Sequence, residues 1–224
     1  MRRVTCTALL AAALVWFPSS ARSQTPGAGR VELSAGARWI GPVAFGTTAA
    51  TETTFGGGKR SLFDSSSQLD PSVGGSVGVG VRLTRVLHVE FAAVYNPTGL
   101  STRIKDDVEG VPDLTVTAPV TQFLFEGGLQ ARPARWHRGR LSPFVTAGVG
   151  YLRQLNDGRT LVETGRAWYF GGGLYYERAA THPRRLKATG VRADLRALIL
   201  RDGVAPDDTR RAAPAITASV FARF

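Results

Sequence analysis

Alternation of apolar and polar residues with a period of two is the dominant pattern of this chain. The end of the chain has it most clearly, where Ile216, Ala218, Val220, Ala222 and Phe224 alternate with Thr217, Ser219, Phe221 and Arg223. A period of two is that of a β-strand, whose successive side chains point to opposite faces. One face is wholly apolar while the other carries an arginine, as expected where lipid lies outside and polar groups lie inside.

Seven further segments repeat this pattern, and each is about as long as a strand that crosses a membrane at a tilt. They are residues 31–41, 72–83, 87–95, 119–131, 141–152, 166–177 and 188–200. The sequence therefore predicts an all-β fold, a transmembrane up-and-down antiparallel β-barrel of eight strands. An even number of strands suits a single-chain bacterial barrel.

The apolar residues of each predicted strand are assigned to the lipid-facing side and the polar residues to the interior. In residues 188–200, Val191, Leu195 and Ile199 alternate with Arg192, Asp194 and Arg196. Residues 166–177 are ambiguous because aromatic residues fall on both parities. The favoured assignment places Trp168, Phe170, Leu174 and Tyr176 outward and Tyr169, Tyr175 and Glu177 inward. A soluble lipocalin-like barrel is the alternative fold, and it would place the apolar residues inside.

Eight ionisable residues are predicted to line the interior: Arg38, Arg82, Glu90, Glu126, Arg192, Asp194, Arg196 and Arg223. Two interpretations are open, a selective pore or a structural network that fills the lumen. The interior of an eight-stranded barrel is just wide enough to be filled by side chains, which favours the network. Arg82 is predicted to lie opposite His88, with Glu90 beside them, as an inner ion-pair cluster.

The predicted connections alternate between long and short ones. Residues 42–71, 96–118, 153–165 and 201–212 are long polar connections, whereas residues 84–86, 132–140 and 178–187 are shorter and basic. Long loops outside and short turns inside are the rule for outer-membrane barrels. Aromatic residues are predicted to form two girdles at the membrane interfaces, Trp39, Tyr95, Tyr151 and Trp168 at the outer rim and Tyr176 and Phe224 at the inner rim.

The first 23 residues have the features of a secretory signal peptide. Arg2 and Arg3 precede an apolar run from Ala8 to Phe17, and small residues follow up to Ser23. Such a charged start, short apolar core and small-residue end mark a segment that is removed after export. The predicted organisation is therefore a signal peptide over 1–23 and an outer-membrane barrel domain over 24–224. The only cysteine, Cys6, lies in the signal, so no disulfide is expected in the mature chain.

The formal net charge of +11 is compatible with nucleic-acid binding. The signal peptide argues against nucleic acid, and outer-membrane lipid and acidic lipopolysaccharide are the expected partners of a monomer. No catalytic residue, cofactor site or metal site is predicted. His88 and Glu90 have the chemistry of an acid–base pair, but they lie near the predicted periplasmic end. His137 and His182 lie in the basic turns. The glycine run 171–173 lies within a predicted strand, and the run 56–58 before Lys59 lacks the spacing of a phosphate-binding loop.

Three segments carry a resemblance to a known family. They are G-V-G-V-R-L-T-R-V-L-H-V-E-F from Gly78, P-F-V-T-A-G-V-G-Y from Pro143 and the ending S-V-F-A-R-F. Over residues 24–224 the chain resembles small outer-membrane β-barrel proteins of the outer membrane protein A and X type. The resemblance implies an eight-stranded barrel in the outer membrane of a Gram-negative-type bacterium. It also implies that the barrel-assembly machinery reads the terminal Phe224, although Val220, Phe221 and Phe224 match the apolar spacing of that signal only loosely.

Three functions are compatible with this pattern. The first is a structural or surface-interaction barrel whose long external loops contact lipopolysaccharide or partner proteins. The second is a narrow porin-like channel for small solutes, and the third is an enzyme that modifies lipid A. Alternation and glycine placement specify the fold more closely than the function, because no active-site motif accompanies them.

Overall fold

The computed structural model describes residues 29–53, 57–105, 112–133, 138–156, 160–180, 185–204 and 209–224. None of the described residues forms a helix that could cross a membrane. The predicted signal peptide, His137 and His182 lie outside the described residues. The strands are β1 (Val31–Ile40), β2 (Val43–Thr53), β3 (Lys59–Leu69), β4 (Ser72–Arg82), β5 (Leu87–Lys105), β6 (Leu114–Ala131), β7 (Leu141–Asn156), β8 (Leu161–Ala179), β9 (Ala188–Asp202) and β10 (Arg211–Arg223).

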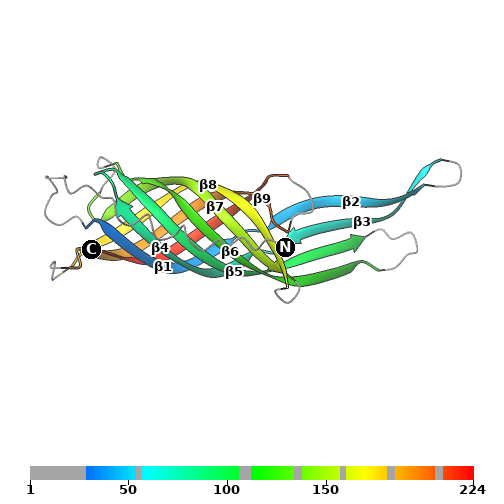
Figure 1. The fold of residues 1–224 in the computed structure, drawn as a ribbon, viewed down its shortest axis with the longest axis horizontal. Helices are drawn as coiled ribbons and strands as arrows, with labels where there is room; N and C mark the ends of the chain where they lie inside the picture. The colour runs from blue at the N-terminus through cyan, green and yellow to red at the C-terminus, as the bar shows by residue number, and fades with distance from the viewer. Residues whose placement is uncertain are drawn as a thin grey trace, which may run out of the picture.

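Eight of these strands close into a barrel, in the order β1, β10, β9, β8, β7, β6, β5 and β4 (Figure 1). Every neighbour is antiparallel, and the pairing of β5 with β6 completes the ring. The predicted eight-stranded antiparallel barrel is therefore confirmed. β2 and β3 lie outside the ring and form a hairpin that pairs with the outer part of β5.

The strand register carries the stagger that a closed barrel needs. Following the cross-strand partners from Tyr176 around the ring leads back to β8 at Arg166, ten residues closer to the N-terminal end of the same strand. Such a shear arises because the strands tilt against the barrel axis, by about 35–45° in barrels of this kind.

The orientation of the side chains matches the prediction on every barrel strand. On β9, Leu195 is 59% exposed while its neighbours Asp194 and Arg196 are 4% and 2% exposed. On the ambiguous strand β8, Phe170 and Tyr176 face outward and Tyr169 and Tyr175 are buried in the interior. The lipocalin-like alternative is wrong, because the apolar stripe lies on the outer surface and the ionic stripe lies inside.

The prediction of a loop over 42–71 is wrong. β2 and β3, of eleven residues each, occupy most of this segment as a hairpin, and Gly41 and Pro42 separate the hairpin from β1. Thr and Ser are frequent in it. Residues 46–53 of β2 are mostly exposed and residues 62–67 of β3 are half-buried on both faces, so no alternating apolar stripe accompanies the strands. A strand without a buried face has no reason to alternate, and its sequence therefore resembles a loop.

The other long connections are also shorter than predicted. β5 continues to Lys105 and β6 begins at Leu114, while β7 ends at Asn156 and β8 begins at Leu161. β9 likewise reaches Asp202 and β10 starts at Arg211. The outer parts of β5 and β6 join the β2–β3 hairpin in a four-stranded sheet that extends beyond one end of the barrel (Figure 1). We call this the projecting sheet and the end that carries it the outer end.

Glycines let an aromatic ring lie flat against the inner wall. Gly128 pairs with Gly148, and Gly148 pairs with Tyr169 on the next strand. A Cβ at Gly148 would collide with the carbonyl oxygen of Gly127 and with the Tyr169 ring. These positions therefore require a residue without a side chain.

Replacing Gly148 with valine is expected to lower the free energy of unfolding by about 1–3 kcal/mol, because the new side chain overpacks the wall against Tyr169. Urea titration of the protein folded in detergent micelles measures the change. The matched control is Gly75→Ala on β4, where an added Cβ meets no atom within 4 Å and should leave stability unchanged. Equal losses for the two variants would contradict the packing explanation.

Candidate functional site

Ion pairs fill the half of the lumen opposite the projecting sheet. Near the end of the barrel that lies away from the projecting sheet, Arg132 and Arg223 bind Glu32 and Glu177. Arg223 Nη2 lies 2.7 Å from Glu32 Oε2 and 3.0 Å from Glu177 Oε1, and Arg132 Nη2 lies 3.1 Å from Glu32 Oε2. Two cations and two carboxylates make this inner cluster electrically neutral.

A second group of ion pairs lies at the middle of the barrel and is also neutral. It consists of three arginines and three carboxylates: Arg38, Arg192, Arg196, Glu90, Glu126 and Asp194. We call it the central cluster. Its members come from β1, β5, β6 and β9, so the contacts cross the lumen rather than follow one strand.

Arg196 is the hub of the central cluster. Its Nε lies 2.6 Å from Asp194 Oδ1, its Nη1 2.8 Å from Glu126 Oε2 and its Nη2 2.8 Å from Glu90 Oε1. Each of the three guanidinium nitrogens of Arg196 thus meets a different carboxylate. Buried carboxylates are costly unless they are paired in this way, so the cluster plugs the lumen with side chains that depend on one another.

Tyr175 connects the two clusters. Its hydroxyl donates to Glu32 Oε1 at 2.8 Å and accepts from Arg192 Nη1 at 3.1 Å. Its ring packs against Phe144 and Phe221, and the Arg132 guanidinium carbon lies 3.7 Å from the ring centroid. The aromatic ring therefore fills the space between the two layers of charge.

Replacing Tyr175 with phenylalanine is expected to cost about 1–3 kcal/mol of stability, because Glu32 and Arg192 each lose a buried hydrogen bond. The control is Tyr176→Phe on the lipid-facing side, whose hydroxyl accepts from the exposed Arg140. Urea titrations of the two variants in the same micelles give the comparison. A Tyr176 variant as unstable as the Tyr175 variant would refute the assigned role of the inner hydroxyl.

Apolar side chains fill the other half of the lumen. This apolar plug contains Ile40, Val43, Leu69, Val94, Val120, Leu124, Leu152, Ala167, Tyr169, Leu198, Leu200, Ala213 and Ala215. Phe45 and Leu100, at the base of the projecting sheet, pack against it. A small void that it borders, beside Leu69, Leu152 and Leu200, has a volume of about 10 Å³, which is room for one water molecule at most.

The predicted interior residues are found where the sequence placed them. Seven of the eight are buried, and Arg82 is half-buried. Arg82 lies opposite His88 as predicted. The predicted ion-pair cluster of Arg82, His88 and Glu90 is nevertheless wrong, because Glu90 binds Arg192 and Arg196 across the lumen.

Two features of the lumen were missed by the sequence analysis. Arg132, assigned to a basic turn, turns into the lumen and binds Glu32 and Glu177. The apolar plug was not predicted either, although A-L-I-L at 197–200 is apolar on both faces of β9 and signals that the interior changes character there. His88 is buried inside the wall, and its Nε2 has no hydrogen-bond partner among the described residues.

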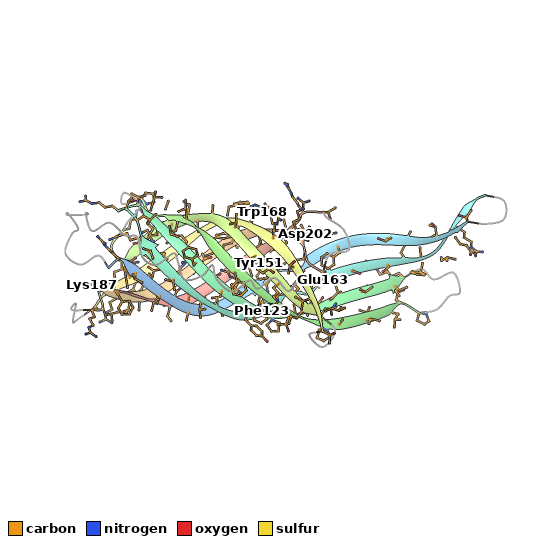
Figure 2. The ribbon with its side chains drawn as sticks, viewed as in Figure 1. Phe123, Tyr151, Glu163, Trp168, Lys187 and Asp202 are labelled. Carbon is orange, nitrogen blue, oxygen red and sulfur yellow. The ribbon has the colours of Figure 1, made fainter. Side chains whose placement is uncertain are left out.

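The outer aromatic girdle lies just inside the outer end. Figure 2 shows Phe123, Tyr151 and Trp168 at one level along the barrel, with Lys187 at the opposite end. Tyr95 packs against Phe123, with ring centroids 5.4 Å apart. Aromatic rings at one level of an apolar outer wall are typical of a membrane interface.

The projecting sheet carries a polar groove of about 460 Å³ outside the barrel. Hydroxyl, amide and basic side chains dominate its lining, among them Thr47, Ser66, Gln68, Ser101, Arg103 and Lys105. Arg103 is bound to Asp113 at 2.8 Å, and both side chains are about half exposed. The groove therefore offers many hydrogen-bonding groups beside its apolar surface.

Comparison with known proteins shows which solved structures have a similar fold. No family model matches the sequence, and no curated protein matches it. Among solved structures, the outer membrane protein OprG from Pseudomonas aeruginosa is 14% identical, with a TM-score of 0.51 over 88% of this chain and 96% of that one. The chain has the fold of small outer-membrane β-barrels. Ail of Yersinia pestis, in complex with the heparin analogue sucrose octasulfate, is 12% identical with a TM-score of 0.41 over 87% of this chain and 99% of that one.

Proposed function

We propose that this protein is an integral outer-membrane barrel with a structural and surface-interaction role, and that it conducts no solutes. The observation that carries the proposal is the filled lumen. Two neutral ion clusters occupy one half, and the apolar plug occupies the other. A solute would have to break buried ion pairs and then enter a dry apolar layer, and both steps are unfavourable.

The projecting sheet is proposed to be the contact surface. Its polar groove combines Ser and Thr hydroxyls with Arg103 and Lys105, which suits the hydroxyl and acidic groups of lipopolysaccharide carbohydrate or a polar partner protein. The exposed terminal Phe224 is proposed to be the residue that the barrel-assembly machinery reads, and the folded chain is proposed to be a monomer. No catalytic role is included in the proposal.

Planar-bilayer conductance tests the closed lumen. The purified wild-type protein is expected to remain silent over a range of salt concentrations and voltages. The matched variant is Leu198→Ala with Leu200→Ala, which removes two apolar side chains from the plug. Steady single-channel currents from the wild-type protein would overturn the proposal in favour of the narrow channel.

A deletion within the β2–β3 hairpin tests the contact surface. Removing residues 47–64 spares Val43 and Leu69, which pack in the apolar plug. The variant should keep the gel mobility shift on boiling that marks a folded barrel, yet lose binding to lipopolysaccharide or to cell surfaces. Unchanged binding by the deletion variant would show that the sheet is not the contact surface.

A further inference from the structure

Four arginines from adjacent strands gather on the outward face at the outer end of the barrel. They are Arg153 on β7, Arg166 on β8, Arg201 on β9 and Arg210 just before β10. Arg166 and Arg201 are direct cross-strand partners, and Tyr151 of the aromatic girdle is the other partner of Arg166. The Arg210 guanidinium carbon lies 5.9 Å from the ring centroid of Trp168. This arginine patch therefore lies at the level of the girdle and just beyond it.

Within the part of the chain that the structure describes, the arginine patch has fewer paired carboxylates than arginines. Like charges directly opposite on neighbouring strands repel each other, yet Arg166 faces Arg201. Among the described residues, Asp202 is the one carboxylate paired with the patch, 3.7 Å from Arg201 Nε. Arg201 Nε is itself shielded from solvent and makes no hydrogen bond there. Glu163, Glu177 and Asp194, the other acids of β8 and β9, belong to the inward-facing set of positions.

An apolar groove begins directly beside the patch, on β8, β9 and β10. In the register, Phe170 pairs with Ala197 and Ala197 pairs with Pro214, two rows further from the outer end than the arginines. The groove has a volume of about 470 Å³ and is lined on its outward side by Phe170, Gly172, Leu195, Ala197, Ala212 and Pro214. Small residues form its floor, while Phe170, Leu195 and Pro214 rise beside it. A shallow apolar channel thus runs along the lipid-facing wall below a cluster of cations.

We propose that this surface is a specific binding site for lipid A, the phosphorylated outer-leaflet lipid. The proposal rests on the proposed outer-membrane location. A phosphate binds Arg166, Arg201 and Arg210, whose guanidinium forks match its oxygens in two-pronged hydrogen bonds. One acyl chain of the same molecule then lies in the groove. The phosphate therefore meets the arginines at the level of the membrane interface, and the acyl chain meets the apolar groove deeper in the membrane.

The opposite wall supplies an internal contrast. A second outward groove of about 510 Å³ is lined by Leu33, Val77, Val79, Phe91, Ala93 and Phe125. The outward positions that follow it toward the outer end are Ala37, Trp39, Gly75, Tyr95 and Phe123, without a cation among them. An apolar groove therefore occurs on both walls, but only the groove on β8–β10 lies beside arginines among the positions compared.

The test compares lipid A binding by the folded full-length barrel and its variants. Native mass spectrometry of the protein in detergent micelles, titrated with bisphosphorylated lipid A, measures the bound fraction. Arg166→Ala with Arg201→Ala is expected to weaken binding at least about tenfold. Arg178→Ala is the matched control, because Arg178 is exposed on the outward face at the other end of β8 and should leave binding unchanged.

Three further titrations fix the ligand. Dephosphorylated lipid A and phosphatidylglycerol should each bind at least about tenfold more weakly, and millimolar inorganic phosphate should not displace lipid A. Equal binding of phosphatidylglycerol, displacement by free phosphate, or wild-type affinity in the double variant would overturn the proposal. Conductance of the wild-type protein would refute the closed lumen without touching these results, so the two failures are distinguishable. All variants are first checked for the gel mobility of a folded barrel.

Discussion

Replacing Arg196 with methionine is expected to lower the free energy of unfolding by about 3–5 kcal/mol. The change keeps most of the side-chain volume and removes the cation that binds Glu90, Glu126 and Asp194. Three buried carboxylates then share Arg38 and Arg192, and one negative charge is left uncompensated in a buried site. Urea titration of the micelle-folded protein, followed by tryptophan fluorescence and gel mobility, measures the loss.

A second substitution distinguishes the effect of the uncompensated charge from the effect of the lost Arg196 contacts. Adding Asp194→Asn to the Arg196 variant leaves Glu90 with Arg192 and Glu126 with Arg38, so every remaining charge keeps a partner. The double variant is expected to be more stable than the single one, as buried pairs can be removed together at little cost. Arg103→Ala, which breaks an exposed pair, should cost less than about 1 kcal/mol. A double variant as unstable as the single one would refute the charge-balance explanation.

The sequence predicts which residues enter the lumen but not which residues meet there. Alternation along β9 assigns Arg192, Asp194 and Arg196 to the interior because a strand has only two faces. Their partners Glu90 and Glu126 come from the far wall, and their alignment depends on the stagger of the closed barrel, which no single strand contains. The prediction therefore grouped Glu90 with Arg82 and His88, which are close along the chain. It did not identify Arg192 and Arg196 as the partners of Glu90.

The projecting sheet escaped prediction for a different reason. Alternation arises when one face of a strand is apolar and the other polar, and residues 47–53 have no buried face. Thr and Ser in this stretch are equally at home in a loop and in an exposed strand. The hairpin is held by its backbone ladder to β5, and side-chain pairs such as Ser67 with Thr102 add little sequence signal.

Replacing Leu198 with alanine is expected to lower the free energy of unfolding by about 2–5 kcal/mol. Leu198 is fully buried in the apolar plug, and the methyl groups lost there leave a cavity that the rigid wall cannot close. Leu195→Ala on the same strand should cost much less, because Leu195 faces outward and lipid chains can fill the space it leaves. Both losses are measured by urea titration in the same lipid bilayers.

The comparison of Leu195 with Leu198 tests the inner and outer surfaces of the barrel on one strand. Both residues are leucines three positions apart, so the residue type gives no reason for the two stability losses to differ. A larger loss at Leu195 than at Leu198 would place the apolar core outside the barrel and contradict the plugged lumen. The expected order, combined with a silent wild-type bilayer recording, would instead mean that the apolar plug supports the wall and blocks passage at the same time. Packing that stabilises the outer half of the barrel would then also be the barrier to solutes.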